Sequence, residues 1–271
     1  MYNADFVFQD MNMKYANAII FSILLAGLAA CCGCPVTQSQ NTPHAQKLCK
    51  SPTGEDYYIY VPTGYDPQKP TPLVITLHGT PPWDVALFQI NEWKALAEEK
   101  NFIVVAPKLS SPQGILPVAK DERKKEVLAD DAEIIALRDS LCREYNIDPK
   151  MILLTGFSAG GYAMFYTGLH HQDKFSILIA RACNNDEITL DGLDAEYNEK
   201  NKSRPRIPVL FFVGKDDLQP IQDQTWMTYR WLRRHGWTHK NCTHKETKGG
   251  HIRRPLTTWE MWQNYLKKYG K

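Results

Sequence analysis

Short, continuous apolar segments alternate with helix-like segments along most of the chain, and this alternation limits the possible folds more than any other feature of the sequence. An apolar segment without polar residues at every second position is typical of a strand buried on both faces of a sheet. Strands are predicted at residues 56–62, 73–79, 101–107, 151–156, 175–182, 207–214 and 242–247. Amphipathic helices are predicted at 84–100, 122–145, 221–235 and from residue 256 onward. This order predicts an α/β fold with a doubly wound, mostly parallel sheet.

A single domain accounts for all of these elements. The chain has 271 residues, enough to bury a substantial core, and we assign residues 51–271 to one catalytic domain. The polar segment 186–205 is predicted to be a loop or small insertion over one end of the sheet. A net charge of +2 provides no strong basic field for nucleic acid, so none is expected as a partner. Local basic runs, including Arg253 and Arg254, are interpreted as solvated.

The amino-terminal region has the features of an export signal. Residues 18–30 form an uncharged stretch of 13 residues, which is short for a membrane span and typical of a signal-peptide core. The stretch ends in LAAC, which resembles the bacterial lipobox, where the cysteine is lipidated and becomes the first residue of the mature protein. A buried helix is the alternative, but residues 32–50 are polar and linker-like. We predict a signal peptide at 1–30, lipidation of Cys31 and a polar linker at 31–50.

This interpretation predicts an extracytoplasmic protein held at a membrane by the lipid on Cys31, with a secreted or periplasmic protein as the alternative. The first twelve residues contain two aspartates and no positive charge, whereas a signal peptide begins with basic residues. A start at Met13, which places Lys14 ahead of the apolar core, fits the pattern better.

The chain has seven cysteines, one of which is assigned to the lipid. Disulfides are permitted outside the cytoplasm. The spacing determines no pairing among the other six, which are Cys32, Cys34, Cys49, Cys142, Cys183 and Cys242.

The sequence GFSAGG at residues 156–161 places Ser158 between a predicted strand and a predicted helix. Gly156 and Gly160 avoid side chains where the strand and helix backbones approach each other closely. Such a turn holds the serine in a strained conformation and exposes its Oγ, and the amides that begin the helix point toward the same place. A glycine-rich turn with an incidental serine is the alternative. The strand before and the helix after favour a nucleophile.

A serine nucleophile needs a base, which is expected late in the chain and after an acid. Of the eight histidines, His251 is preferred, because it follows the last predicted strand in a loop that contains Gly249 and Gly250. The acid is expected at the end of the strand at 207–214, where Asp216 and Asp217 lie. Asp217 is preferred, and Asp216 remains the alternative.

The strand at 73–79 leads into Thr80, whose N–H is predicted to form an oxyanion hole together with the N–H of Ala159. His78 is interpreted as a residue that hydrogen-bonds to the scaffold rather than as a base. Trp83 and Trp226 are candidate walls of the substrate pocket, but core packing is the preferred interpretation for both, because the chain has seven tryptophans.

The segments YYIYVPTGYDP, PLVITLHG, FIVVAP, GFSAGG, GKDD and GGH together resemble the α/β-hydrolase branch that contains feruloyl esterases, acetylxylan esterases and polyhydroxybutyrate depolymerase-like esterases. The resemblance covers residue 56 to the carboxyl terminus. It implies a serine carboxylic-ester hydrolase that needs no metal or cofactor and acts on feruloyl, acetyl or polyester-type esters through an acyl-enzyme. By position it also implies a triad of Ser158, Asp217 and His251, with Thr80 and Ala159 as oxyanion donors.

Two other functions remain open at this point. A serine peptidase of the same fold is the second enzymatic interpretation, which the lack of a gating domain ahead of residue 51 disfavours. A non-catalytic surface-binding lipoprotein is the third, which the complete set of serine, aspartate and histidine disfavours.

Overall fold

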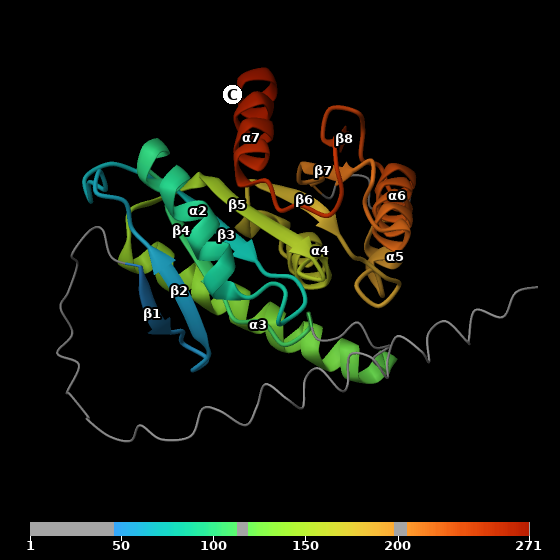
Figure 1. Ribbon diagram of the computed structural model, residues 1–271, viewed down its shortest axis with the longest axis horizontal. Coiled ribbons are helices and arrows are strands. Elements are labelled where there is room, and N and C mark those ends of the chain that lie inside the picture. Colours follow the sequence, from blue (N-terminus) through green and yellow to red (C-terminus); the bar gives the residue numbers. More distant parts are fainter. Residues whose placement is uncertain (1–45, 113–118, 198–204, 271) are drawn as a thin grey trace, which may run out of the picture. The chain divides into compact units, whose positions relative to one another are not determined.

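The computed structural model describes residues 46–112, 119–197 and 205–270, which form an eight-stranded sheet with helices on both faces (Figure 1). The strands are β1 (Lys47–Lys50), β2 (Asp56–Tyr60), β3 (Thr71–Leu77), β4 (Ile103–Pro107), β5 (Ile147–Ser158), β6 (Ile177–Cys183), β7 (Val209–Gly214) and β8 (Cys242–Thr247). The helices are α2 (Ala86–Lys100), α3 (Lys120–Glu144), α4 (Gly161–His170), α5 (Leu193–Glu196), α6 (Gln219–Arg234) and α7 (Pro255–Tyr269), and a 3₁₀ turn covers Gln172–Lys174.

The strand order is β1-β2-β4-β3-β5-β6-β7-β8. The six strands β4, β3, β5, β6, β7 and β8 run parallel to one another. Strand β1 is antiparallel to β2, and β2 is antiparallel to β4. The carboxyl ends of β3, β5, β7 and β8 therefore lie at one edge of the sheet, and the loops that follow them meet there.

Two apolar cores cover the two faces of the sheet. Leu73, Ile75 and Leu77 of β3 face the core formed with α3, α4 and α6, and Val74 faces the core formed with α2 and α7. This alternation follows from the period of two in a strand. Every residue of β4, β6 and β7 is buried, because helices cover both faces there. The predicted α/β-hydrolase fold with a mostly parallel sheet is confirmed.

Strand β1 corrects the predicted domain boundary. Its residues 47–50 were assigned to the linker at 31–50, but they pair antiparallel with β2, from Lys47 opposite Ile59 to Lys50 opposite Asp56. The strand is short, it lies at the edge of the sheet, and its side chains alternate between partly buried and exposed. Four residues with two lysines carry too little apolar pattern to predict a strand. The remainder of the predicted signal peptide and linker, including Cys31, lies outside the described residues.

Four of the seven cysteines fall within the described residues, and all four are free thiols: Cys49, Cys142, Cys183 and Cys242. Burial raises the pKa of Cys183 and of Cys242 to about 12, so both remain protonated and pack as small apolar side chains. Within 46–112, 119–197 and 205–270, no helix has the length and apolarity that a membrane crossing requires.

Candidate active site

Ser158 is the last residue of β5, three residues before α4 begins. Its φ is +52°, a left-handed conformation that is unfavourable for a residue with a Cβ. The serine is partly exposed, and it lines a pocket together with His251. The strand–turn–helix geometry predicted around Ser158 is therefore present.

Close backbone packing explains the glycines around Ser158. A Cβ on Gly156 would lie 2.7 Å from the carbonyl oxygen of Gly160, and a Cβ on Gly160 would lie 2.5 Å from the carbonyl oxygen of His78. Real Cβ atoms do not approach backbone oxygens this closely. The turn therefore needs glycine at both positions to bring β3, β5 and α4 together.

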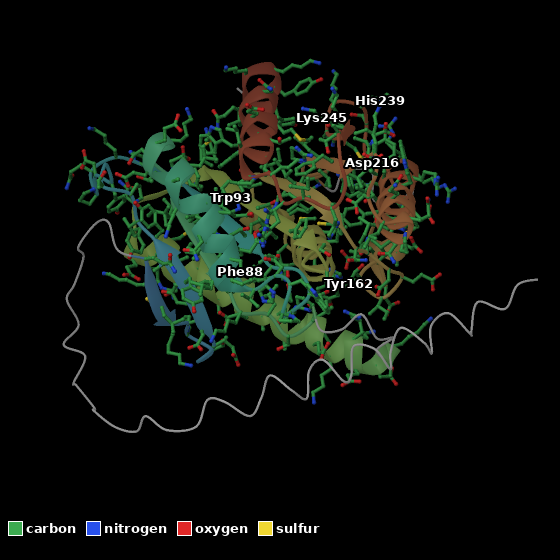
Figure 2. The ribbon with its side chains drawn as sticks, viewed as in Figure 1. Phe88, Trp93, Tyr162, Asp216, His239 and Lys245 are labelled. Atoms are coloured by element: carbon green, nitrogen blue, oxygen red, sulfur yellow. The ribbon has the colours of Figure 1, made fainter. Side chains whose placement is uncertain are left out.

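His251 and Asp217 contact each other directly. Nδ1 of His251 lies 2.9 Å from Oδ1 of Asp217, whose side chain is fully buried. The same Oδ1 accepts the N–H of Leu218 at 2.7 Å, which orients the carboxylate. Asp216 is exposed, and Figure 2 labels its position near α6. The geometry thus pairs His251 with the preferred aspartate and not with the alternative.

The loop that carries His251 is pressed against the end of β7. A Cβ on Gly214 would lie 2.2 Å from the carbonyl oxygen of Gly249 and 2.4 Å from that of Gly250. The N–H of Asp216 also donates to the carbonyl oxygen of Gly249 at 3.1 Å. By contrast, His239, which Figure 2 labels, lies ahead of β8 and not in the loop that follows this strand.

The two predicted oxyanion donors lie where β3 and β5 end. In the part of the chain that the structure describes, the N–H groups of Thr80 and Ala159 have no hydrogen-bond acceptor. Ala159 is buried and lies two residues before α4 begins, and the N-terminal end of a helix favours negative charge. Thr80 lines the pocket, and Ala159 directly follows Ser158, which also lines it.

His78 behaves as predicted for a scaffold residue. Its Nδ1–H donates to the carbonyl oxygen of Gly79 at 2.8 Å, and its Nε2 accepts the N–H of Leu109 at 3.0 Å. Burial lowers the pKa of His78, so the imidazole is held neutral with both nitrogens occupied. The ring links the loop after β3 to the loop after β4 and is not among the residues that line the pocket of Ser158 and His251.

The pocket has a volume of about 500 Å³. Three apolar side chains line it while exposing most or about half of their surface: Trp83 (66%), Leu218 (63%) and Ile252 (48%). We call these three residues the apolar rim. Trp83 is a pocket wall and not a core residue, so the preferred interpretation was wrong for Trp83. Trp226 packs on His244, with 4.2 Å between the ring centroids, and is not among the pocket's lining residues.

Sequence reasoning missed a group of charged residues beside the pocket. Arg253, which was interpreted as solvated, forms ion pairs with Asp84 and Glu92, and its side chain is only 32% exposed. Asp84 and Arg253 both line the pocket. Burial raises the pKa of Glu92, and the neighbouring guanidinium groups of Arg181 and Arg253 oppose that rise. The only sequence signal was the proximity of Arg253 to His251.

No cluster of histidine, cysteine, aspartate or glutamate suited to a metal ion occurs within the described ranges. The polar groups at the pocket include a hydroxyl and an imidazole, which can transfer protons, and a guanidinium. A serine, an imidazole paired with a buried carboxylate and two unpaired amides can together attack a carbonyl carbon and stabilise the oxyanion that forms.

Comparison with known proteins agrees with this geometry. The family model Esterase, described as "Putative esterase", matches residues 54–266. A bifunctional acetylxylan esterase/xylanase from Neocallimastix patriciarum is 32% identical over 114 residues, which is 42% of this chain and 16% of the relative. The dipeptidyl-peptidase 5 of Porphyromonas endodontalis is 23% identical over 150 residues, 54% of this chain and 21% of that protein. The matched segment thus spans a small part of both relatives.

Among solved structures, a CE1 ferulic acid esterase from Anaeromyces mucronatus in complex with ferulic acid has the same fold, with a TM-score of 0.60 and 17% identity. The likeness covers 88% of this chain and 96% of that chain. The resemblance stated from the sequence motifs is confirmed for the family and the fold.

The packing of Gly214 generates a testable prediction. Gly214→Ala should push the Gly249–Gly250 segment away from β7, because the new Cβ meets two backbone oxygens. A displacement of about 1 Å at His251 should slow the reaction of Ser158 with a fluorophosphonate probe by about 100-fold, as followed by intact mass. Gly270→Ala is the matched control, since its Cβ also meets a backbone oxygen, that of Leu266 at 2.6 Å, but at the end of α7. Equal labelling rates in Gly214→Ala and the wild type would contradict the prediction.

Proposed function

Because the chain belongs to the Esterase family, we propose that it is a serine carboxylic-ester hydrolase in which Ser158 is the nucleophile, His251 the base and Asp217 the acid that orients the base. The observation that carries this proposal is the 2.9 Å contact between His251 Nδ1 and Asp217 Oδ1 beside the strained Ser158. A buried carboxylate on Nδ1 leaves Nε2 of His251 free to accept the serine proton.

The first half of the reaction forms an acyl-enzyme. Ser158 Oγ attacks the ester carbonyl carbon while its proton passes to Nε2 of His251. The carbonyl oxygen becomes an oxyanion that accepts hydrogen bonds from the N–H groups of Thr80 and Ala159. Collapse of this intermediate breaks the ester C–O bond, and His251 returns its proton to the departing alkoxide, which leaves as the alcohol.

The second half regenerates the enzyme. A water molecule gives a proton to Nε2 of His251 as its oxygen attacks the acyl carbon, and the same two amides stabilise the second oxyanion. Collapse breaks the bond to Ser158 Oγ, and the proton on His251 passes to that oxygen. The carboxylic acid product then leaves. This cycle uses only residues of the chain and water.

The apolar rim favours esters with a substantial apolar part. Trp83, Leu218 and Ile252 together present exposed apolar surface that a ligand can bury. The relatives named above include an acetylxylan esterase and a ferulic acid esterase, so feruloyl and acetyl esters are the first substrates to test, followed by polyesters.

A peptidase is the second candidate function, because the chain shares 23% identity with a dipeptidyl-peptidase 5. The two candidates use the same nucleophile, so the substrate decides between them. Parallel assays with short p-nitrophenyl esters and with dipeptidyl p-nitroanilides measure both activities. Faster turnover of the anilides would favour the peptidase.

We also propose that Cys31 carries a lipid and that the domain works outside the cytoplasm. The apolar stretch at 18–30 and the LAAC sequence support this proposal. Each buried CH₂ of an acyl chain contributes about 0.8 kcal/mol to membrane binding, and two or more chains are needed for stable anchoring.

Ser158→Ala tests the nucleophile. The substitution removes Oγ and no packing atom of the core, so kcat for a p-nitrophenyl ester should fall by about 10⁴- to 10⁶-fold while the circular dichroism spectrum stays unchanged. A folded variant that retains more than a few per cent of the wild-type activity would place the nucleophile elsewhere.

Asp217→Asn tests the orienting carboxylate, and Asp216→Asn is its control. An asparagine favours the wrong imidazole tautomer, so kcat should fall by roughly 10⁴-fold. Asp216→Asn should retain kcat within about threefold, because surface substitutions away from such contacts have small effects, and the Asp216 side chain is exposed. An exchange of these two effects would make Asp216 the acid.

Cys31→Ser tests the anchor. The variant should leave the membrane fraction or remain unprocessed, because a serine cannot carry the thioether-linked lipid. Activity of the isolated domain should not change. Intact mass of the wild-type protein is the direct measurement, and a mature amino terminus other than a lipid-bearing Cys31 would contradict the proposal.

A further inference from the structure

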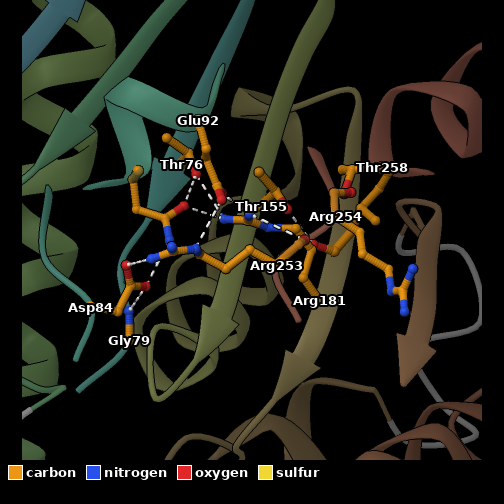
Figure 3. A network of polar contacts seen from close by, with 12 residues as sticks. Thr76, Gly79, Asp84, Glu92, Thr155, Arg181, Arg253, Arg254 and Thr258 are labelled. Carbon is orange, nitrogen blue, oxygen red and sulfur yellow. Dashed lines mark hydrogen bonds and ion pairs between the residues drawn. The ribbon is translucent and has the colours of Figure 1, made fainter. Parts of the chain in front are cut away.

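Four charged side chains, two of which line the pocket, form a continuous network (Figure 3). Arg181 Nη1 lies 2.8 Å from Glu92 Oε1, and Arg253 Nε lies 2.9 Å from Glu92 Oε2. Arg253 Nη1 in turn lies 2.7 Å from Asp84 Oδ1. The two guanidinium groups and two carboxylates alternate, so each charge has an opposite neighbour. The cycle proposed above uses none of these four side chains.

Arg181 anchors the network in the sheet. Its side chain is fully buried on β6, where Nη2 donates to Thr76 Oγ1 at 2.8 Å and also to Oε1 of Gln89. Its Nη1 additionally contacts the carbonyl oxygen of Arg253 at 3.5 Å. These partners come from β3, α2 and the segment after β8, so the guanidinium is held by three separate parts of the fold.

Asp84 connects the network to the loop that carries Thr80. Asp84 Oδ2 accepts the N–H of Gly79 at 2.7 Å and Nε2 of Gln89 at 2.6 Å, while Oδ1 binds Arg253. The Asp84 side chain is only 4% exposed. A buried carboxylate with three hydrogen-bonding partners has few alternative positions, and it therefore fixes the backbone immediately before Thr80.

Arg253 connects the network to the loop that carries His251. It lies two residues after His251, and both residues line the pocket. Asp84 and Arg253 are 169 residues apart in the sequence, so the ion pair between them is a tertiary link between two loops. Each of these loops carries one component of the proposed reaction: an oxyanion donor in the first and the general base in the second.

We propose that Asp84 and Arg253 are positioning residues, whose ion pair fixes the position of the Thr80 amide relative to the His251 imidazole. The inference rests on the proposed function, because it concerns the same site. A small relative movement of the two loops separates the oxyanion donor from the base, so the pair acts on turnover through Thr80 and His251.

The experiment compares Asp84→Asn, Arg253→Met and the double variant in a p-nitrophenyl ester assay. Asparagine keeps an acceptor for the Gly79 N–H but loses the ion pair, and methionine keeps part of the apolar stem of the arginine. Each single variant should lower kcat by about 10- to 100-fold with KM within about threefold, because the reacting groups are misplaced and the substrate contacts remain. The kcat of the double variant should lie within about threefold of the kcat of the slower single variant, because both substitutions break the same ion pair.

Arg138→Met is the matched control, since Arg138 is also partly buried and ion-paired, with Asp139, but on α3. It should retain kcat within about twofold even where it lowers the melting temperature as much as Arg253→Met does. Arg253→Lys keeps the charge but, as a single ammonium, cannot reproduce the forked contact with two carboxylates, so its kcat should fall between those of Arg253→Met and the wild type. If Arg253→Met does not fold, Asp84→Asn and Arg253→Lys carry the test.

Several results would overturn the coupling while leaving the proposed function intact. These are a folded Arg253→Met or Asp84→Asn variant with wild-type kcat, a raised KM at unchanged kcat, multiplicative losses in the double variant, or an equal loss of kcat in Arg138→Met. A wild-type protein without ester hydrolysis that depends on Ser158 would instead overturn the proposed function, and the coupling with it. The Ser158→Ala variant in the same assay separates the two cases.

Discussion

The close approach of backbones at the carboxyl end of β5 is the constraint on which the site depends. β5 pairs with β3 on one side and β6 on the other, so its last residue lies in the middle of the sheet edge. A side chain on Gly156 or Gly160 would separate β5 from α4 or from β3, and Ser158 would no longer reach the pocket. The second close approach, between Gly214 and the Gly249–Gly250 segment, brings the His251 loop to the same edge. Both contacts are backbone against backbone, which explains why they need glycine and leave little freedom for movement.

The sequence predicted the parallel core of the sheet and the placement of Ser158, because both follow from local patterns. Buried strands appear as uninterrupted apolar segments, and the strand–glycine–serine–glycine–helix order specifies a turn. The choice of Asp217 over Asp216 was preferred from the sequence, but only the contact with His251 distinguishes the two geometrically. Adjacent aspartates after one strand have the same local pattern, so their difference in burial depends on the packing of α6 and of the His251 loop.

The elements that the sequence did not predict depend on tertiary contacts. β1 is a strand because β2 offers a free edge, and its four residues alone carry no pattern that requires one. Arg253 was interpreted as solvated because a charged residue in a glycine-containing loop has no local signal of burial, and its partners Asp84 and Glu92 come from a distant part of the chain. Trp226 and Trp83 illustrate the same limit, since an aromatic residue in a core and one in a pocket wall look alike in the sequence. Only the fold places Trp83 at the pocket and Trp226 against His244.

The network around Arg181 is difficult to explain by stability alone. Removing charges from water is costly, and a buried ion-paired network is often no more stabilising than apolar side chains of similar volume. Its distinguishing property is that it joins particular loops in one arrangement. These two loops and the loop of Asp217 also carry the apolar rim, because Trp83 follows Thr80 by three residues, Ile252 is adjacent to His251 and Leu218 is adjacent to Asp217. Under the proposed mechanism, each loop therefore contributes one reacting or orienting group and one surface for the substrate. A loop displacement therefore moves the reacting or orienting group, whereas a rim side chain can be replaced without moving the backbone that holds its catalytic neighbour.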